Sequence, residues 1–180
     1  HSHLLPIAFA SPFAPEYLQV PLQLYRANFK PSAQLAAPHA IIGVGVFAAE
    51  TDAAAQRLFT SSLLQFLNLV RGHPTPLPPP VDSMDGRWSG GEERAVRERT
   101  RYSAVGSPEA VRRRIGEVLE DTKADEIGAT AQIYDHAARL RSFEAARARL
   151  PGSLGPAIRP PRAVYPLPRD AAARHAAPLR

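Results

Sequence analysis

The feature that most constrains how this chain can fold is a fourfold alternation between short apolar runs and segments of helical periodicity. A short apolar run rich in β-branched residues is typical of a strand buried on both faces of a parallel sheet. Alternation with helices implies right-handed crossovers, which leave such strands parallel. We therefore expect an α/β fold with strands at residues 4–10, 40–47, 102–105 and 126–133, each followed by a helix, at residues 14–30, 51–69, 107–121 and 137–150.

Four strand–helix units make half of a (β/α)8 barrel, which takes about 250 residues. They are also enough for a small open α/β sheet, and periodicity does not separate the two architectures. We expect the units to form one domain over residues 1–150, with a proline-rich insertion loop at residues 73–91. A loop of this length is either functional or disordered. The strongly charged residues 92–101 that follow it are typical of a solvated helix.

Capping residues support several helix boundaries. Thr51 or Asp52 can cap the second helix, and Asp135 can cap the last one. Ser107 is a good N-cap before Pro108, because proline suits the first helical position. Pro21, in contrast, is expected to kink or interrupt the helix over residues 14–30.

Residues 151–180 differ from the rest in composition. They contain seven prolines, five arginines and one acid, so we expect a disordered tail. This tail carries +4 of the net charge of +5, whereas residues 1–150 hold 17 basic and 16 acidic groups. The pI of about 10.1 therefore comes from the tail, and it argues only weakly for a nucleic-acid-binding face.

Composition excludes some chemistry. The chain has no cysteine, which excludes disulfides and thiolate catalysis. No apolar run approaches the roughly 18 residues of a membrane-spanning helix. The sequence begins at His1 and its single methionine is Met84, which favours a fragment or a processed chain.

Four segments together carry a family resemblance. They are a strand and turn at residues 5–15, a strand running into a helix start at 42–52, a strand–helix junction at 105–109, and a strand with its helix at 124–144. These segments resemble the bacterial luciferase-like flavin-dependent monooxygenases. They occur in the family's order and spacing, and together they cover roughly residues 4–147. Pro12 departs from the pattern, because close relatives often carry histidine there. The resemblance implies a partial (β/α)8 TIM barrel, about strands 5–8.

The resemblance also implies a function. Such an enzyme uses reduced FMN, or a deazaflavin, and molecular oxygen to oxidise an organic substrate. A separate flavin reductase would supply the reduced flavin, and the missing N-terminal half of the barrel would be a partner. We expect this chain to be inactive alone, cytoplasmic and able to form a homodimer. The loop at 73–91 could serve as a lid.

In a (β/α)8 barrel the chemistry lies at the C-terminal ends of the strands. The candidates at these positions are Phe9, Ser11, Gly45, Phe47, Ser107, Gln132, Tyr134 and His136. His136 and Arg139 are the candidate catalytic pair, since one helical turn brings them together; the alternative is a polar pair that anchors the last helix. The candidate flavin-binding residues have structural alternatives as turn, core, packing or capping residues, and they are Ser11, Phe13, Gly45, Ser107 and Tyr134. The sequence indicates no metal site.

Two other classes of function remain open at this point. One is a small non-catalytic α/β binding module, which would fold as a monomer and ignore flavin. The other is a nucleic-acid-binding protein, which would depend on the basic tail and lose binding when residues 151–180 are removed.

Overall fold

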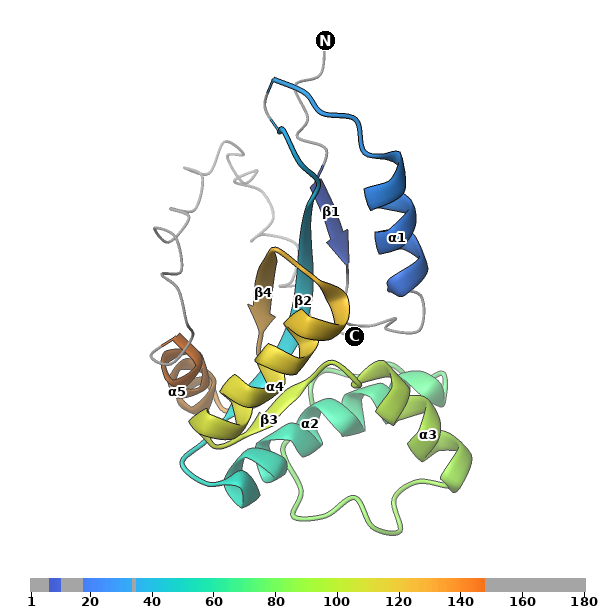
Figure 1. The fold of residues 1–180 in the computed structure, drawn as a ribbon. Coiled ribbons are helices and arrows are strands. Elements are labelled where there is room, and N and C mark those ends of the chain that lie inside the picture. Colours follow the sequence, from blue (N-terminus) through green and yellow to red (C-terminus); the bar gives the residue numbers. More distant parts are fainter. Residues whose placement is uncertain (1–6, 11–17, 34, 148–180) are drawn as a thin grey trace, which may run out of the picture. The chain divides into compact units, whose positions relative to one another are not determined.

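The computed structural model describes residues 7–10, 18–33 and 35–147, and strands and helices alternate as expected (Figure 1). A further short helix lies between the second and third units, where the charged residues 92–101 indicated a solvated helix. The elements are β1 Ile7–Ala10, α1 Gln19–Asn28, β2 His39–Ala48, α2 Asp52–Val70, α3 Gly90–Arg99, β3 Ala104–Gly106, α4 Pro108–Thr122, β4 Glu126–Thr130 and α5 His136–Arg147.

Strand β2 is the centre of a parallel sheet. β1 pairs with its first residues, from Ile7 opposite His39 onwards, and β4 pairs with Ile41–Gly45. Because β1 and β4 both pair with Ile41 and Ile42, they lie on opposite edges of β2 (Figure 1). β3 pairs only with the last three residues of β2. The expected parallel α/β sheet is therefore present.

The position of β4 differs from the order of a complete barrel. In a closed barrel the strands are neighbours in chain order, so β4 would lie beside β3. β3 has three residues, whereas β4 makes a five-residue ladder with β2. The longer ladder satisfies more backbone groups, and β4 accordingly lies beside β2.

Beyond the end of the β4 ladder, a serine of α5 forms hydrogen bonds with the same edge of β2. Val44 accepts a hydrogen bond from the Thr130 hydroxyl, at 3.5 Å. Two residues further along the same edge, Ser142 Oγ donates to the carbonyl of Val46 at 3.2 Å and accepts from the N–H of Ala48 at 2.9 Å. Ser142 is fully buried, so its hydroxyl supplies the partners that a strand would otherwise provide.

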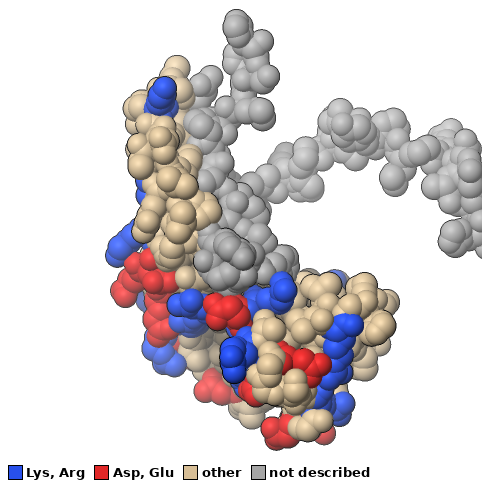
Figure 2. Space-filling view, turned by 90° about the vertical axis from the view of Figure 1, so that its right-hand side faces the viewer, with Lys and Arg blue, Asp and Glu red and all other residues tan. Residues whose placement is uncertain are grey.

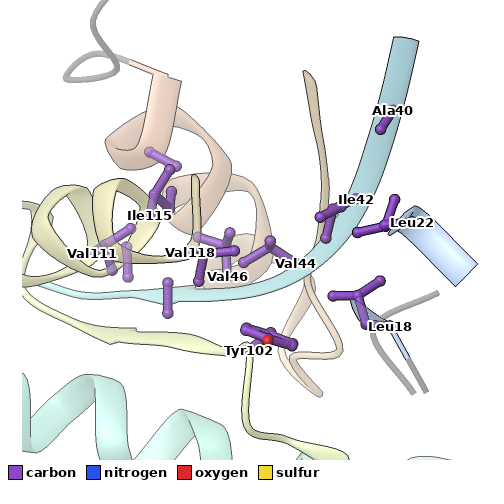
Figure 3. Packing of buried hydrophobic residues seen from close by; sticks show 13 residues of the cluster. Leu18, Leu22, Ala40, Ile42, Val44, Val46, Tyr102, Val111, Ile115 and Val118 are labelled. Carbon is purple, nitrogen blue, oxygen red and sulfur yellow. The ribbon is translucent and has the colours of Figure 1, made fainter. Parts of the chain in front are cut away.

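Both faces of β2 are covered. Its even-numbered side chains, such as Val44 and Val46, pack with residues of α1 and α4 (Figure 3). Its odd-numbered Phe47 packs on the other face with residues of α2 and α3, and the Phe47 and Phe59 rings lie 4.7 Å apart. This double burial explains the near-continuous apolar sequence of β2.

The segment between α2 and α3 lacks helix and strand, as predicted, but it is anchored to α2. Thr60 Oγ1 donates to the Val81 carbonyl at 3.0 Å and accepts from the Val81 N–H at 2.8 Å. Met84 is buried in the cluster that contains Phe47. Arg71 donates to Glu92 at 2.7 Å and, by this hydrogen bond above all, lowers the pKa of that carboxyl to about 2. The role of this segment as a lid stays a prediction.

Three boundary expectations need correction. α1 begins at Gln19, so Pro21 lies in its first turn, where N–H groups have no intrahelical partner, and it does not interrupt the helix. β3 begins at Ala104, two residues later than expected, because the backbone of residues 100–103 closes a turn. β4 ends at Thr130, three residues early. The expected tail at 151–180 lies outside the described residues.

Replacing Ser142 should weaken the chain measurably. Ser142→Ala leaves the buried backbone groups of Val46 and Ala48 without their hydroxyl partner, and we expect a loss of about 1–3 kcal/mol in the free energy of unfolding. Urea titration followed by circular dichroism measures this loss.

Ser61→Ala is the matched control. Ser61 is equally buried, yet its hydroxyl has no hydrogen-bond partner within the described residues. Its removal should leave stability unchanged or raise it. Equal effects of the two substitutions would refute the edge role of Ser142.

Candidate functional site

A small cavity lies against the odd-numbered face of β2. Gly45 and Thr130, which are partners in the β2–β4 ladder, form one wall together with Phe47. Ser62 of α2 and Ser103 also line it. Its volume is about 20 Å³, which suffices for a single water molecule. The cavity thus lies near the C-terminal ends of β2 and β4, where α/β barrels place their chemistry.

A larger cavity of about 350 Å³ adjoins the small one. The two cavities share the lining residues Phe66, Arg99 and Gln132. The outer walls come from α2 and from the loop that follows it, through Leu69 and Pro74 among others. This volume falls within the range of small-molecule sites in proteins.

Gly45 borders the small cavity and has close neighbours. A Cβ at this position would lie 3.1 Å from Ser103 Oγ and 3.2 Å from a ring carbon of Phe47. The absence of a side chain therefore serves the packing of Ser103 and Phe47 and also keeps the cavity open. A flavin-binding role for Gly45 stays a prediction.

The helix start at Ser107 does not offer a free anion site. Asp52 Oδ1 accepts a hydrogen bond from the Ser107 N–H at 2.6 Å, and this bond is the main reason that the pKa of Asp52 is lowered. Ser107 itself caps α4, since its hydroxyl accepts from the Ala110 N–H. The capping interpretation is confirmed, and a carboxylate of the chain occupies the place proposed for a cofactor anion.

Gly106 makes this arrangement possible. Its φ is 146°, a conformation that side-chain-bearing residues rarely adopt. A Cβ would lie 2.7 Å from the Cβ of Ala110 and 2.8 Å from Asp52 Oδ1. Only glycine lets the carboxylate of α2 reach the start of α4.

His136 and Arg139 are in contact, as their spacing predicts. Arg139 Nη2 lies 2.7 Å from His136 Nδ1. Because a guanidinium can only donate, Nδ1 accepts and the ring proton is on Nε2. His136 is exposed, and neither residue lines the two cavities described above. Asp135 caps α5 through the Ala138 N–H, as predicted. The catalytic role of the pair stays a prediction.

The remaining predicted site residues are dispersed. Tyr134 is 56% exposed, and it lies outside both cavity linings. Ser11 and Phe13 lie outside the described residues. Within the described ranges, no group of three or more histidines and acids is placed to hold a metal ion. No described helix is both long and apolar enough to cross a membrane.

The surface charge of the described residues is mixed. On the face shown in Figure 2, basic and acidic side chains are interleaved, and no broad patch of one sign forms. Ion pairs among the described residues include Arg97 with Glu93 and Arg114 with Glu117. This face lacks the basic stripe that a nucleic-acid-binding surface requires.

Of the residues that line both cavities, Gln132 was a candidate at the end of its strand, whereas sequence reasoning missed Phe66 and Arg99. Arg99 belongs to a charged segment that appeared to be a solvated helix, and Gln132 follows β4. The hydroxyl of Ser62 lies 3.2 Å from Gln132 Oε1, a contact between residues 70 positions apart. A faint signal was available: Ser61 and Ser62 are polar residues on the apolar face of the predicted helix.

Comparison with known proteins finds relatives that align with most of the sequence of this chain. The chain is 46% identical over 142 residues to a protein of Escherichia coli K12 named "Luciferase-like monooxygenase", and 44% identical over 140 residues to the uncharacterized protein YvbT of Bacillus subtilis. These alignments cover 79% and 78% of this chain but 42% of each relative, so the chain spans about two fifths of their length.

The fold comparison agrees with the sequence comparison. The crystal structure of apo-MsnO8 matches with a TM-score of 0.66 and 32% identity, over 78% of this chain and 44% of that one. No protein-family model matches the chain.

The carboxylate of Asp52 should make stability depend on pH. Its pKa is lower in the folded chain than the ordinary value of 3.8, so its contribution is present above pH 3.8 and is lost as the pH falls toward the folded value. Asp52→Asn should therefore unfold more easily than the wild type at pH 7, and this difference should shrink below pH 3.8. Thermal unfolding from pH 2.5 to pH 7 measures it.

Asp85→Asn is the control, because Asp85 is exposed and its carboxylate has no hydrogen bond or ion pair within the described part of the chain. A constant difference between wild type and Asp52→Asn across the whole pH range would exclude the proposed contribution of the Asp52 carboxylate.

Adding one methyl group at Gly106 should be costly. Gly106→Ala combines an unfavourable φ with contacts shorter than 3.0 Å, and we expect it to lower the free energy of unfolding by about 2–3 kcal/mol. Gly116→Ala, in the middle of α4 with open space around its Cβ, should instead stabilise by up to about 1 kcal/mol. Urea unfolding of both variants tests the pair, and a neutral Gly106→Ala would contradict the geometry.

Proposed function

Because this chain is a homologue of the luciferase-like monooxygenases, we propose that it forms part of the catalytic domain of a flavin-dependent monooxygenase. The proposed reaction uses reduced flavin and molecular oxygen on an organic substrate, and reduced FMN is the proposed cofactor, with a deazaflavin as the alternative. The observation that carries the proposal is the 46% identity over 142 residues to a protein named as a monooxygenase.

The described residues alone do not fit a whole flavin. The small cavity has room for one water molecule, and the helix start at Ser107 is filled by the Asp52 carboxylate. Gly45 can contribute a wall without a side chain, but no described residue of the predicted set supplies a cluster of donors for a phosphate. We therefore propose that this chain provides one wall of the flavin site and is inactive alone.

The rest of the proposed site comes from outside the described residues. The relatives are more than twice as long as the segment they share with this chain, and we propose that the barrel strands they have in addition complete the site. The unpaired outer edges of β1 and β4 within the described sheet are where such strands would add. A homodimer could cover the same edges. We propose a cytoplasmic location, with a separate reductase supplying reduced flavin.

A non-catalytic α/β binding module remains the second candidate. It is favoured by one observation, the burial of both faces of β2 within the described residues, which indicates a core that does not depend on flavin. Such a module would fold as a monomer and remain monomeric when FMN is added.

A chimaera tests the primary proposal. This chain replaces its 142-residue counterpart in the E. coli relative, and FMN binding is followed by fluorescence quenching. We expect saturable binding at micromolar FMN by the chimaera, and none in this range by the 180-residue chain alone.

The unmodified E. coli relative is the positive control, and thermal unfolding verifies that each protein is folded. A folded chimaera that ignores FMN, while the relative binds it, would refute the flavin site. Micromolar FMN binding by the chain alone would refute its proposed incompleteness.

A further inference from the structure

Arg99 differs from the other arginines that are partly buried. It is the last residue of α3 and lines both cavities. Arg26, Arg114 and Arg139 are also partly buried, and each donates a hydrogen bond to a carbonyl, a carboxylate or an imidazole. For Arg99 no hydrogen bond or ion pair links it to any residue within 7–10, 18–33 or 35–147. Its five N–H donors are thus available to a ligand.

Two polar side chains on the same lining as Arg99 keep hydrogen-bond donors that no described residue uses. Gln132 Oε1 is engaged by the hydroxyl of Ser62, which leaves the two N–H groups of its amide. Thr75 Oγ1 accepts from Asn68 Nδ2 at 2.9 Å, which leaves its O–H to donate. Among the described residues that line the two cavities, none is aspartate or glutamate. A guanidinium, an amide and a hydroxyl without a carboxylate nearby favour an anion.

The other walls of the larger cavity are apolar. Phe66 and Leu69 of α2 lie on one side and Pro74 on another. The volume of about 350 Å³ exceeds what an inorganic anion needs and suits a small organic molecule. A ligand that is complementary to both the polar and the apolar walls has one anionic group attached to a hydrocarbon part.

We propose that the larger cavity binds an organic acid, with its carboxylate on Arg99 and its hydrocarbon part against Phe66, Leu69 and Pro74. A planar carboxylate matches the fork of a guanidinium with two parallel hydrogen bonds. The Gln132 amide and the Thr75 hydroxyl lie on the same lining and complete the donor set. This inference goes beyond the proposed function, because the site consists of described residues of this chain and requires no flavin.

Isothermal titration of the full 180-residue chain tests the proposal without flavin. The probes are straight-chain carboxylates from butanoate to decanoate, the matching neutral amides, and inorganic phosphate and hexyl phosphate. We expect saturable binding of the carboxylates that tightens with chain length, and at least tenfold weaker binding of the amides. Arg99→Gln should weaken carboxylate binding at least tenfold, and Arg99→Lys should restore part of it.

Arg94→Gln is the matched control, because Arg94 lies exposed on the same helix and outside both cavities. It should bind like the wild type. Circular dichroism verifies the fold of each variant, and the Arg99→Lys variant keeps the test decisive if Arg99→Gln fails to fold. Equal binding of acids and amides, equal binding by the folded Arg99 variants and the wild type, or Arg99-dependent binding of phosphates alone would each overturn the proposal.

Discussion

The structure depends on the burial of one strand, β2, on both faces and along both edges. β2 contributes side chains to apolar clusters on both of its faces, and its backbone is paired along both edges. A backbone buried in this way cannot form hydrogen bonds with water, so each N–H and C=O group needs a hydrogen-bond partner within the chain. β1 and β4 supply partners along the first part of the strand, and β3 and Ser142 supply them at its end. The positions of α1, α2, α4 and α5 follow from this requirement, since each covers a face or an edge of β2.

The cavities arise where this enclosure is least complete. Gly45 presents no side chain to the odd-numbered face, and Thr130 ends the ladder beside it. Helix α2 covers the odd-numbered face of β2. Its Phe66 belongs to the buried cluster that contains Phe47 and also lines the larger cavity. The polar residues that line the two cavities come from four separate parts of the chain, namely α2, the loop after it, residues 99–103 and residues 130–132.

Two electrostatic arrangements within the described residues have opposite consequences. The Asp52 carboxylate accepts a hydrogen bond at the N-terminus of α4, where the helix dipole is positive. This bond links the start of α2 to the start of α4. Arg99, only a few residues before β3, has no such internal partner in the described part of the chain. The Ser107 N–H already has an acceptor in Asp52 and is not available to a ligand. The Arg99 guanidinium has no such acceptor in the described residues and is available to a ligand. The proposed flavin site and the proposed acid site do not depend on each other.

The sequence by itself determined the parallel α/β class, the alternation of elements and the caps at Ser107 and Asp135, because these depend on local periodicity and on side chains within one turn of their targets. For the second helix it left Thr51 and Asp52 as alternatives, and the structure has Thr51 as the cap. The family resemblance was visible in four short segments for the same reason, and the 46% identity confirms it. Only the tertiary structure decided that β4 pairs with β2, that Ser142 completes a strand edge 94 positions away, and that Asp52 fills the anion position at Ser107. These contacts join residues tens of positions apart, and their partners are selected by three-dimensional competition for buried hydrogen bonds, which no local pattern records.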